Sequence, residues 1–304
     1  MVPKTRWLSD GILLLIAAIW GLTFVLIQNA IATIPPFSFV ALRFSCAALL
    51  LLPFLGKQKS AAPTTLSRVH LLMCGGLLGF FLFLGYALQT FSLLYTTSGK
   101  SGFLTGLAVT LVPLLAWLIL GTRPALLALI GVGVATVGLY LLAFVDISTI
   151  NPGDVLAFFC AIAFGLQVVY TGKFSGLASA HTLVLIQLST VAVLSAIAAL
   201  IFEPWQLIFQ HSILFQAPVI IALIVTAVFA TALAYLAQTH IQKFTTPTRV
   251  ALIFATEPVF AALADYLWHG TTLGLRAFIG CLLILGGTLL TEIKWPWRTA
   301  PEHP

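Results

Sequence analysis

The sequence predicts an all-α polytopic membrane protein, in which ten transmembrane helices form two inverted five-helix repeats. Three observations predict this fold class. Apolar residues make up 61% of the 304 residues, and Lys, Arg, Asp and Glu together only 7%, whereas a soluble globular domain carries about 25% charged residues. The apolar residues are grouped in runs of about 20, the length that crosses the hydrocarbon core of a bilayer as a helix. The two halves of the chain also match each other in sequence.

This composition excludes several other classes of protein. A soluble fold of this size could not cover its surface with 14 basic and 8 acidic residues, and so high an apolar content excludes a disordered chain. Ten spans of about 20 residues use about 200 residues, which leaves no room for a separate soluble domain. The basic residues are scattered, so the net charge of +6 does not indicate a nucleic-acid partner.

Ten apolar runs follow one another with short links, so consecutive helices are expected to be antiparallel neighbours. They span residues 8–30, 36–55, 69–92, 98–120, 124–144, 152–172, 180–202, 217–240, 247–267 and 273–292. Their length and the lack of alternating polarity exclude a transmembrane β-barrel. N-cap residues precede three of the runs: Ser9-Asp10 the first, Asn151-Pro152 the sixth and Thr246-Pro247 the ninth.

The first run is predicted to remain in the mature protein. Lys4 and Arg6 precede it, and Ala30-Ile31-Ala32 resembles a signal-peptidase site. However, the apolar stretch from Gly11 to Ile27 is long for a signal peptide, and it has a counterpart in the second half of the chain. We therefore expect a first transmembrane helix and not a cleaved leader.

Lys and Arg residues predict that both termini are cytoplasmic. With the N-terminus inside, eleven of these residues face the cytoplasm and two face outward, as the positive-inside rule requires. The cytoplasmic set is Lys4, Arg6, Lys57, Lys59, Arg68, Arg123, Lys173, Lys243, Arg249, Lys294 and Arg298. The outer set is Lys100 and Arg276, and Arg43 lies within a helix. We expect a multi-pass protein of the inner (plasma) membrane.

Two long alignments without gaps relate the halves of the chain. Residues 10–45 align with 154–189, and residues 84–142 align with 233–291, where LGYALQT meets LAYLAQT and YTTSGK meets FTTPTR. Because each half holds an odd number of helices, the second half must insert with opposite polarity. We therefore expect one repeat at 1–144, a second at 150–293 and a cytoplasmic tail at 294–304. Inverted repeats of this kind build secondary transporters.

Five segments resemble the EamA-type branch of the drug/metabolite transporter superfamily. They are IAAIWGLTFVLIQ (16–28), LRFSCAALLLLP (42–53), YTTSGKSGFLTGL (95–107), VPLLAWLILGTRP (112–124) and EPVFAALADYLWHG (257–270). The resemblance covers nearly the whole chain. It implies a central cavity lined mainly by helices 1, 3, 4, 6, 8 and 9, with helices 5 and 10 as packing helices. Its characterised members move amino acids, nucleotide-linked sugars, phosphorylated metabolites, drugs or cofactors, so the resemblance does not specify a substrate.

Glu257 is the strongest single candidate for a functional residue. It lies about ten residues into the ninth run, which is about 15 Å deep at ~1.5 Å per residue. An ionisable group at that depth costs on the order of 3 kcal/mol or more unless it faces a polar cavity or a partner. Glu257 would suit proton coupling or a counter-charge for a cationic substrate, and Pro258 would kink the helix beside it. The alternative is a structural carboxylate that braces the helix.

Two basic residues have both a functional and a structural interpretation. Arg43 could attract an anionic group, or it could form a structural ion pair with an acid such as Asp265 or reach toward the interface. Lys100 could attract anions at the outer mouth of the cavity, or it could likewise reach the interface. Residues 99–101 read GKS, but the earlier glycine and the strand of a phosphate-binding loop are absent.

Aromatic, amide and hydroxyl side chains on the expected cavity helices complete the candidate substrate site. Such walls suit small amphipathic molecules, although aromatic residues also fill membrane bundles for packing alone. The candidate set, besides Lys100, is Trp20, Thr23, Phe24, Tyr86, Gln89, Thr105, Gln167, Tyr170, Tyr235 and Phe254.

No motif of an enzyme or of a metal or cofactor site is present in the sequence. The four cysteines and six histidines are dispersed, without C-x-x-C or H-E-x-x-H spacing, and there is no G-x-S-x-G. We therefore expect no enzyme activity, no cofactor and no metal. The expected partners are a small-molecule substrate and the lipid bilayer, and a monomer is plausible.

The sequence thus predicts a secondary transporter of a small metabolite, such as an amino acid or a related amphipathic compound. Alternating access, export and possible proton coupling through Glu257 complete this hypothesis. The alternative hypothesis is a lipid flippase or a partner in a membrane complex.

Overall fold

The computed structural model describes residues 3–54, 67–92, 94–96, 98–143, 150–210, 214–270 and 274–290, and these residues contain helices and no strand. Within them, nine helical spans are long and apolar enough to cross a membrane, and Leu275–Leu290 is a shorter apolar helix. The predicted all-α membrane fold is therefore confirmed. Each predicted run coincides with one span to within a few residues.

The first half of the chain forms five spans. They are α1 (Pro3–Ile31), α2 (Pro36–Leu51), α3 (Arg68–Ser92), α4 (Ser98–Gly106) followed by α5 (Ala108–Leu120), and α6 (Leu126–Ala143). The second half repeats this order. Its first two spans are α7 (Pro152–Phe174) and α8 (Ala180–Phe202), and its third span consists of α10 (Ala217–Val225), η3 (Thr226–Leu233) and α11 (Ala234–Ile241) without a break. Its fourth span is α12 (Pro247–Phe254) followed by α13 (Glu257–His269), and its last helix is α14 (Leu275–Leu290). Short η1 (Leu52–Phe54) and η2 (Trp205–Phe209) follow α2 and α8.

Two of the three predicted N-caps are confirmed. Asn151 and Asp154 form a reciprocal capping box at the start of α7, and Thr246 accepts a hydrogen bond from the backbone N–H of Arg249 at the start of α12. The prediction at Ser9-Asp10 was wrong, because α1 already begins at Pro3. Asp10 points instead into a contact between helices, which satisfies its carboxylate without a helix start.

The discontinuous spans preserve the repeat in detail. The fourth span breaks at Leu107 and the ninth at Ala255-Thr256, and the segments that follow, α5 and α13, each have 13 residues. Both segments end in a left-handed glycine, Gly121 with φ 69° and Gly270 with φ 67°. These positions coincide in the sequence alignment of residues 84–142 with 233–291. The break expected beside Pro258 is present, because Pro258 lies in the first turn of α13.

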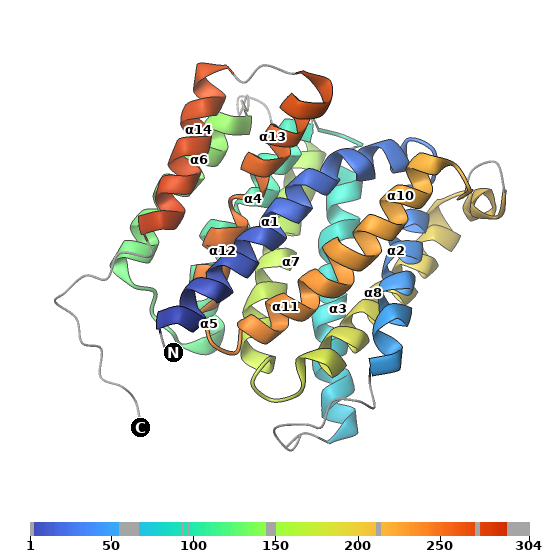
Figure 1. Cartoon of the computed structure of the whole chain (residues 1–304), viewed down its shortest axis with the longest axis horizontal. Coiled ribbons are helices and arrows are strands. Elements are labelled where there is room, and N and C mark those ends of the chain that lie inside the picture. The colour runs from blue at the N-terminus through green and yellow to red at the C-terminus, as the bar shows by residue number, and fades with distance from the viewer. Residues whose placement is uncertain are drawn as a thin grey trace.

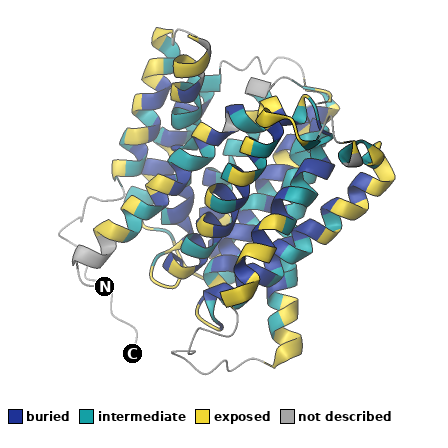
Figure 2. Ribbon diagram, turned by 45° about the vertical axis from the view of Figure 1, so that its right-hand side comes forward, coloured by how far each residue is buried: buried dark blue, intermediate teal, exposed yellow. Residues whose placement is uncertain are grey.

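Helices of the two halves are interleaved and do not form separate lobes. Helix α3 packs against α7 and α8, α2 against α8, α1 against α13, and α6 against α14. Figure 1 shows α6 and α14 side by side at one edge of the molecule and α2 with α8 toward the opposite edge. In Figure 2 the buried residues line the interior, whereas exposed residues follow the outward faces. Many of these exposed side chains are large and apolar, as a lipid-facing surface requires.

Glycine contacts bring α6 and α14 close together, as expected for packing helices. A Cβ atom on Gly138 would lie 2.6 Å from the carbonyl oxygen of Gly280, and one on Gly287 would lie 2.5 Å from the carbonyl oxygen of Gly131. Both contacts involve backbone, which cannot move aside as a flexible side chain can. Small residues are what allow membrane helices to approach this closely.

Candidate functional site

Six aromatic side chains meet in the middle of the bundle. We call this set the central aromatic cluster: Trp20, Phe44, Tyr86, Phe164, Tyr235 and Phe254. Ring centroids lie 4.8 Å apart for Trp20 and Phe254, 5.7 Å for Trp20 and Tyr235, and 5.6 Å for Tyr86 and Phe164. The two tyrosine hydroxyls are 3.4 Å apart. The cluster draws on α1, α2, α3, α7, α11 and α12, so residues from both halves build it.

Arg43 is buried beside this cluster, with only 3% of its surface exposed. Its Nε donates to the Thr231 hydroxyl at 2.6 Å and one terminal nitrogen donates to the Ala230 carbonyl at 3.3 Å. The guanidinium carbon also lies 5.5 Å from the ring centroid of Phe44 and 5.9 Å from that of Tyr86. Within the part of the chain that the structure describes, the hydrogen-bond partners of the guanidinium are thus neutral groups. The Asp265 side chain lies outside the described residues, so the alternative expectation of an ion pair between Arg43 and an acidic group such as Asp265 stays a prediction.

The segment that receives Arg43 is a π-helix. Element η3 is wound as a π-helix over eight residues, a rare geometry that is concentrated at functional sites. Its Ala230 carbonyl also accepts a hydrogen bond from Trp20 Nε1 at 2.8 Å. In the first half, the corresponding segment is part of the regular helix α3. Gln187 of α8 is the residue that aligns with Arg43, and its buried side-chain amide has no hydrogen-bond partner among the described residues. The π-helix therefore supplies the acceptors that Arg43 and Trp20 require.

Glu257 stands at the start of α13, directly after the break in the ninth span. It is partly buried, and no group in the described parts of the chain hydrogen-bonds to its carboxylate. Glu257 lies beside the central aromatic cluster, because it follows Phe254 by three residues and its backbone carbonyl packs against Gly21, the neighbour of Trp20. One positive and one negative group therefore share the central aromatic cluster without forming a closed ion pair between them.

A chain of amides extends from this centre. Gln238 Nε2 donates to Gln242 Oε1 at 3.0 Å and approaches Gln167 Oε1 at 3.4 Å, while Gln167 Nε2 donates to the Thr171 hydroxyl at 3.1 Å. Gln242 Nε2 donates in turn to the Val168 carbonyl at 2.9 Å. The Oε1 atom of Gln238 is buried without a partner in the described structure. This row of amides joins α7 to α11 on the interior of the bundle.

Some predicted site residues have other surroundings. The Thr23 hydroxyl donates to carbonyls of its own helix, Thr105 approaches Cys160 Sγ at 3.7 Å, and Tyr170 stacks on Phe81 with centroids 5.5 Å apart. Gln89 is half-buried on α3, and its carbonyl accepts from the Ser92 hydroxyl. The Phe24 side chain lies outside the described residues. The structure therefore gathers Trp20, Tyr86, Tyr235, Phe254 and Glu257, and it joins Gln167 to them only through the amide chain.

Lys100 forms an ion pair with Asp154, with Nζ and Oδ2 2.6 Å apart. Arg249 makes a second ion pair with Asp10, in which Nη2 lies 2.6 Å from Oδ2 and Nε 2.8 Å from Oδ1. Both pairs are largely shielded, since the side chains involved are 7–15% exposed. These acidic partners were not among the predicted site residues, although the sequence alignment of Asp10 with Asp154 and of Lys100 with Arg249 offered a way to find them.

Glu203 is a further carboxylate that the sequence analysis missed. It accepts hydrogen bonds from the backbone N–H groups of Phe37 and Ser38 at 2.6 and 2.8 Å and from the Ser38 hydroxyl at 2.9 Å. A carboxylate at the N-terminus of α2 satisfies backbone donors that have no partner within the helix. Its role in this structure is to fix the start of α2 against the end of α8.

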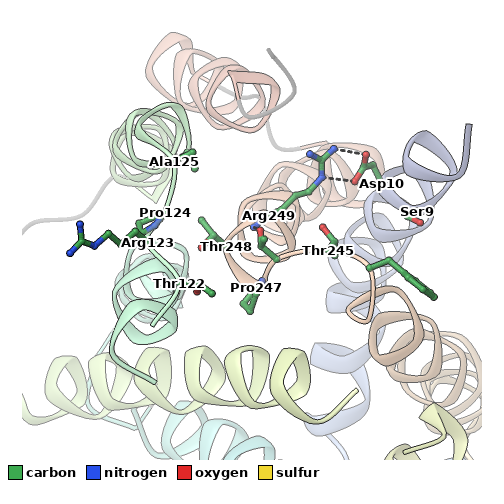
Figure 3. Close-up of a pocket in the computed structure, with 13 residues that line it drawn as sticks. Ser9, Asp10, Thr122, Arg123, Pro124, Ala125, Thr245, Pro247, Thr248 and Arg249 are labelled. Atoms are coloured by element: carbon green, nitrogen blue, oxygen red, sulfur yellow. Dashed lines mark hydrogen bonds and ion pairs between the residues drawn. The ribbon is translucent and has the colours of Figure 1, made fainter. Parts of the chain in front are cut away.

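An open cavity of about 560 Å³ lies at the end of the bundle where α5 ends and α12 begins. Figure 3 shows Thr248 and Pro247 at its centre, with the Asp10–Arg249 ion pair on one side and the side chain of Arg123 directed away from it. The remaining described lining residues are Ser9, Thr122, Pro124, Ala125, Ala128, Phe244, Thr245 and Thr246. None of the described residues that line this cavity belongs to the central aromatic cluster, so the two sites are distinct.

Comparison with known proteins supports a transport function for this fold. A sequence model described as the EamA-like transporter family matches residues 7–144 and 151–293. The chain is 32% identical over 289 residues to an "uncharacterized transporter" of Archaeoglobus fulgidus, covering 95% of this chain and 87% of that protein. It is 26% identical over 306 residues to the "uncharacterized transporter YvbV" of Bacillus subtilis, covering 96% of this chain and 93% of that protein.

The fold is also similar to that of a protein of known crystal structure. The two superpose with a TM-score of 0.75 over 93% of this chain and 96% of the other, at 18% sequence identity. At this identity the likeness concerns the fold alone.

Proposed function

Because the chain belongs to the EamA-like transporter family and is a membrane transporter, we propose that it is a secondary transporter that moves a small zwitterionic or amphipathic metabolite, such as an amino acid, by alternating access. The observation that carries this proposal is the juxtaposition of Arg43 and Glu257 at the central aromatic cluster. An amino acid presents a carboxylate, an ammonium group and often an apolar side chain. These three features match the guanidinium, the carboxylate and the aromatic walls in charge and character.

Membrane burial makes this match energetically meaningful. A buried charge without a full counter-charge is costly in a low-dielectric interior, and a substrate of opposite charge removes part of that cost. The carboxylate of Glu257 lacks a hydrogen-bond partner in the described structure, whereas Arg43 keeps its charge among neutral acceptors. Both groups would therefore gain from a bound zwitterion.

We further propose that Glu257 couples transport to protons and that the direction is export. Proton coupling requires an ionisable group that reaches the site and changes partners during the cycle, and Glu257 lies at a break between two helical segments. The orientation with cytoplasmic termini in the plasma membrane, predicted from the basic residues, belongs to this proposal. A single chain encloses the site, so a monomer is sufficient.

The test is thermal stabilisation of the detergent-purified protein by a library of amino acids and related metabolites at pH 6 and pH 8. A ligand at 100 times its Kd stabilises the native state by about 2.7 kcal/mol, which is readily measured. We expect one chemical class to stabilise the wild type, and we expect Glu257→Gln to remove the pH dependence. Glu203→Gln is the matched control, because its carboxylate caps α2 away from the site: it should lower the melting temperature and preserve the ligand-induced shift.

Uptake into proteoliposomes then tests transport itself. With the stabilising compound as substrate, an imposed proton gradient should accelerate its movement in the wild type and leave Glu257→Gln unaffected. Equal stabilisation of both proteins at both pH values would assign Glu257 a structural role. Stabilisation only by phospholipids would replace this proposal with a lipid flippase.

A further inference from the structure

The two buried ion pairs occupy equivalent positions in the two repeats. Asp10 aligns with Asp154, and Lys100 aligns with Arg249. In the folded chain each acid binds the basic residue of the other half: Asp10 binds Arg249, and Asp154 binds Lys100. Each ion pair is therefore a contact between the two halves. The two ion pairs use equivalent positions because the halves are inverted repeats of each other.

The two ion pairs lie at opposite ends of the bundle. Helices α1 and α12, which carry Asp10 and Arg249, begin at the same end, because an even number of spans separates the beginning of α1 from that of α12. Helices α4 and α7, which carry Lys100 and Asp154, begin at the other end, as the course of the chain in Figure 1 shows. The central aromatic cluster lies between them. Each ion pair thus joins the two halves at one end of the bundle.

The end marked by Asp154 is held more firmly. Besides Lys100, the Asp154 carboxylate accepts hydrogen bonds from the Thr96 hydroxyl at 2.8 Å and from the backbone N–H of Asn151 at 2.9 Å. Among the described residues, the Asp10 carboxylate accepts hydrogen bonds from Arg249, and this ion pair borders the open cavity of Figure 3. The additional partners of Asp154 favour closure at the Asp154 end.

Helix packing is also closer toward the Asp154 end than toward the Asp10 end. A Cβ atom on Gly21 of α1 would lie 2.6 Å from the carbonyl oxygen of Glu257, so α1 and α13 touch through backbone. A Cβ atom on the equivalent Gly165 of α7 would meet side-chain atoms alone among its three nearest neighbours, the nearest being the end of Leu115 at 3.0 Å. Helix α13 runs toward the Asp154 end and α5 toward the Asp10 end. The structure is therefore packed more tightly on the Asp154 side of the centre.

We propose that the two ion pairs are the gates of the transport cycle, so that Asp10–Arg249 closes one route to the central site and Lys100–Asp154 closes the other. The inference rests on the proposed transport function and adds the residues that control access. In this structure both gates are formed, and Asp10–Arg249 is the gate that opens more readily. Breaking one gate should shift the conformational equilibrium toward access from that end and away from the other. The two ends are coupled because the same two halves move against each other as rigid bodies at both ends.

The experiment measures access to the centre and needs no substrate. In a background where Cys46, Cys74, Cys160 and Cys281 are replaced by Ser or Ala, Phe254→Cys places one reporter thiol in the central aromatic cluster. A membrane-impermeant maleimide is applied to right-side-out and to inside-out membrane vesicles, and the initial labelling rate is recorded for each side. Arg249→Gln and Lys100→Gln are matched variants, because they are equivalent positions and each leaves its acid in place.

We expect Arg249→Gln to raise labelling from the Asp10 side by about fivefold or more, the lower range of typical coupling between sites, and to lower labelling from the Asp154 side. Lys100→Gln should do the reverse. The charge-swapped double variant Asp10→Arg with Arg249→Asp should return both rates toward those of the reference. If either variant raises labelling from both sides, or if neither changes it, the ion pairs are static clamps and the inference is wrong.

A second pair of variants covers the case in which a neutralised ion pair prevents folding. Asp10→Cys with Arg249→Cys, oxidised to a disulfide, should abolish labelling from the Asp10 side and preserve it from the other, and a reductant should restore it. Unchanged labelling after oxidation would overturn the inference. Labelling does not depend on transport, so the two proposals can fail separately. If the variants change labelling as expected but the protein transports no metabolite, the proposed function is wrong and the assignment of the two ion pairs as gates is kept.

Discussion

Replacing Gly21 or Gly165 with Ala adds the same methyl group at two equivalent positions with very different surroundings. At Gly21 the new Cβ would lie 2.6 Å from the Glu257 carbonyl oxygen and 2.7 Å from the Ala261 backbone nitrogen, so α1 and α13 must separate. Overpacking of this kind costs about 1–3 kcal/mol. At Gly165 the nearest atom to the methyl is the flexible end of Leu115 at 3.0 Å, with Val112 at an ordinary contact distance of 3.6 Å. The helix gains up to about 1 kcal/mol from the replacement of glycine.

We therefore expect Gly21→Ala to destabilise the protein by about 2 kcal/mol, and Gly165→Ala to be neutral or slightly stabilising. For a chain of 304 residues, a loss of about 2 kcal/mol corresponds to a fall in Tm of about 3 °C for Gly21→Ala. Thermal unfolding in detergent, followed by tryptophan fluorescence at constant lipid content, measures both. Equal losses, or a larger loss at Gly165, would show that the α1–α13 contact is no closer than its counterpart and would refute the reasoning.

Three further predictions concern single hydrogen-bonded groups. Trp20→Phe removes the hydrogen bond to the Ala230 carbonyl and should cost about 1 kcal/mol of stability, together with a loss of ligand-induced stabilisation in the same melting assay. Glu203→Ala leaves the backbone donors at the start of α2 unsatisfied and should cost about 1–3 kcal/mol without weakening the ligand-induced shift; a weaker shift would place Glu203 in the site. Asn151→Ala removes the cap of α7 and should cost about 1 kcal/mol, and hydrogen exchange should show the loss first at the amides of that helix's first turn.

Helix positions were predictable because the bilayer imposes a length on each apolar run. The break in the ninth span was expected beside Pro258, whereas the break at Leu107 in the fourth span was not predicted, although Leu107 aligns with Thr256 and Gly121 with Gly270. Glu257 stood out because a lone carboxylate deep in an apolar run requires an explanation. The sequence could not show what surrounds Arg43, because its acceptors come from a π-helix and no residue pattern in 226–233 distinguishes that winding from an ordinary helix.

Contacts between the halves were the other part that the sequence left open. Lys100 has a good partner in Asp154, but the two lie in different repeats and only the fold brings them together. The interpretation of Lys100 as a substrate contact at the cavity mouth therefore stays a prediction, and the structure favours a role in joining α4 to α7. Similarly, nothing in the sequence around Glu203 connects it with the start of α2.

The glycine contacts between α6 and α14 have the geometry of an isologous interface. Gly131 aligns with Gly280 and Gly138 with Gly287, and the contacts join Gly138 to Gly280 and Gly131 to Gly287, so the same contact is made twice with the roles exchanged. Two copies of a single five-helix chain, inserted in opposite orientations, would meet through the same surface. In such a dimer one substitution would alter both contacts together. In the fused chain each contact can change alone, so the two ends of the molecule are free to become unequal.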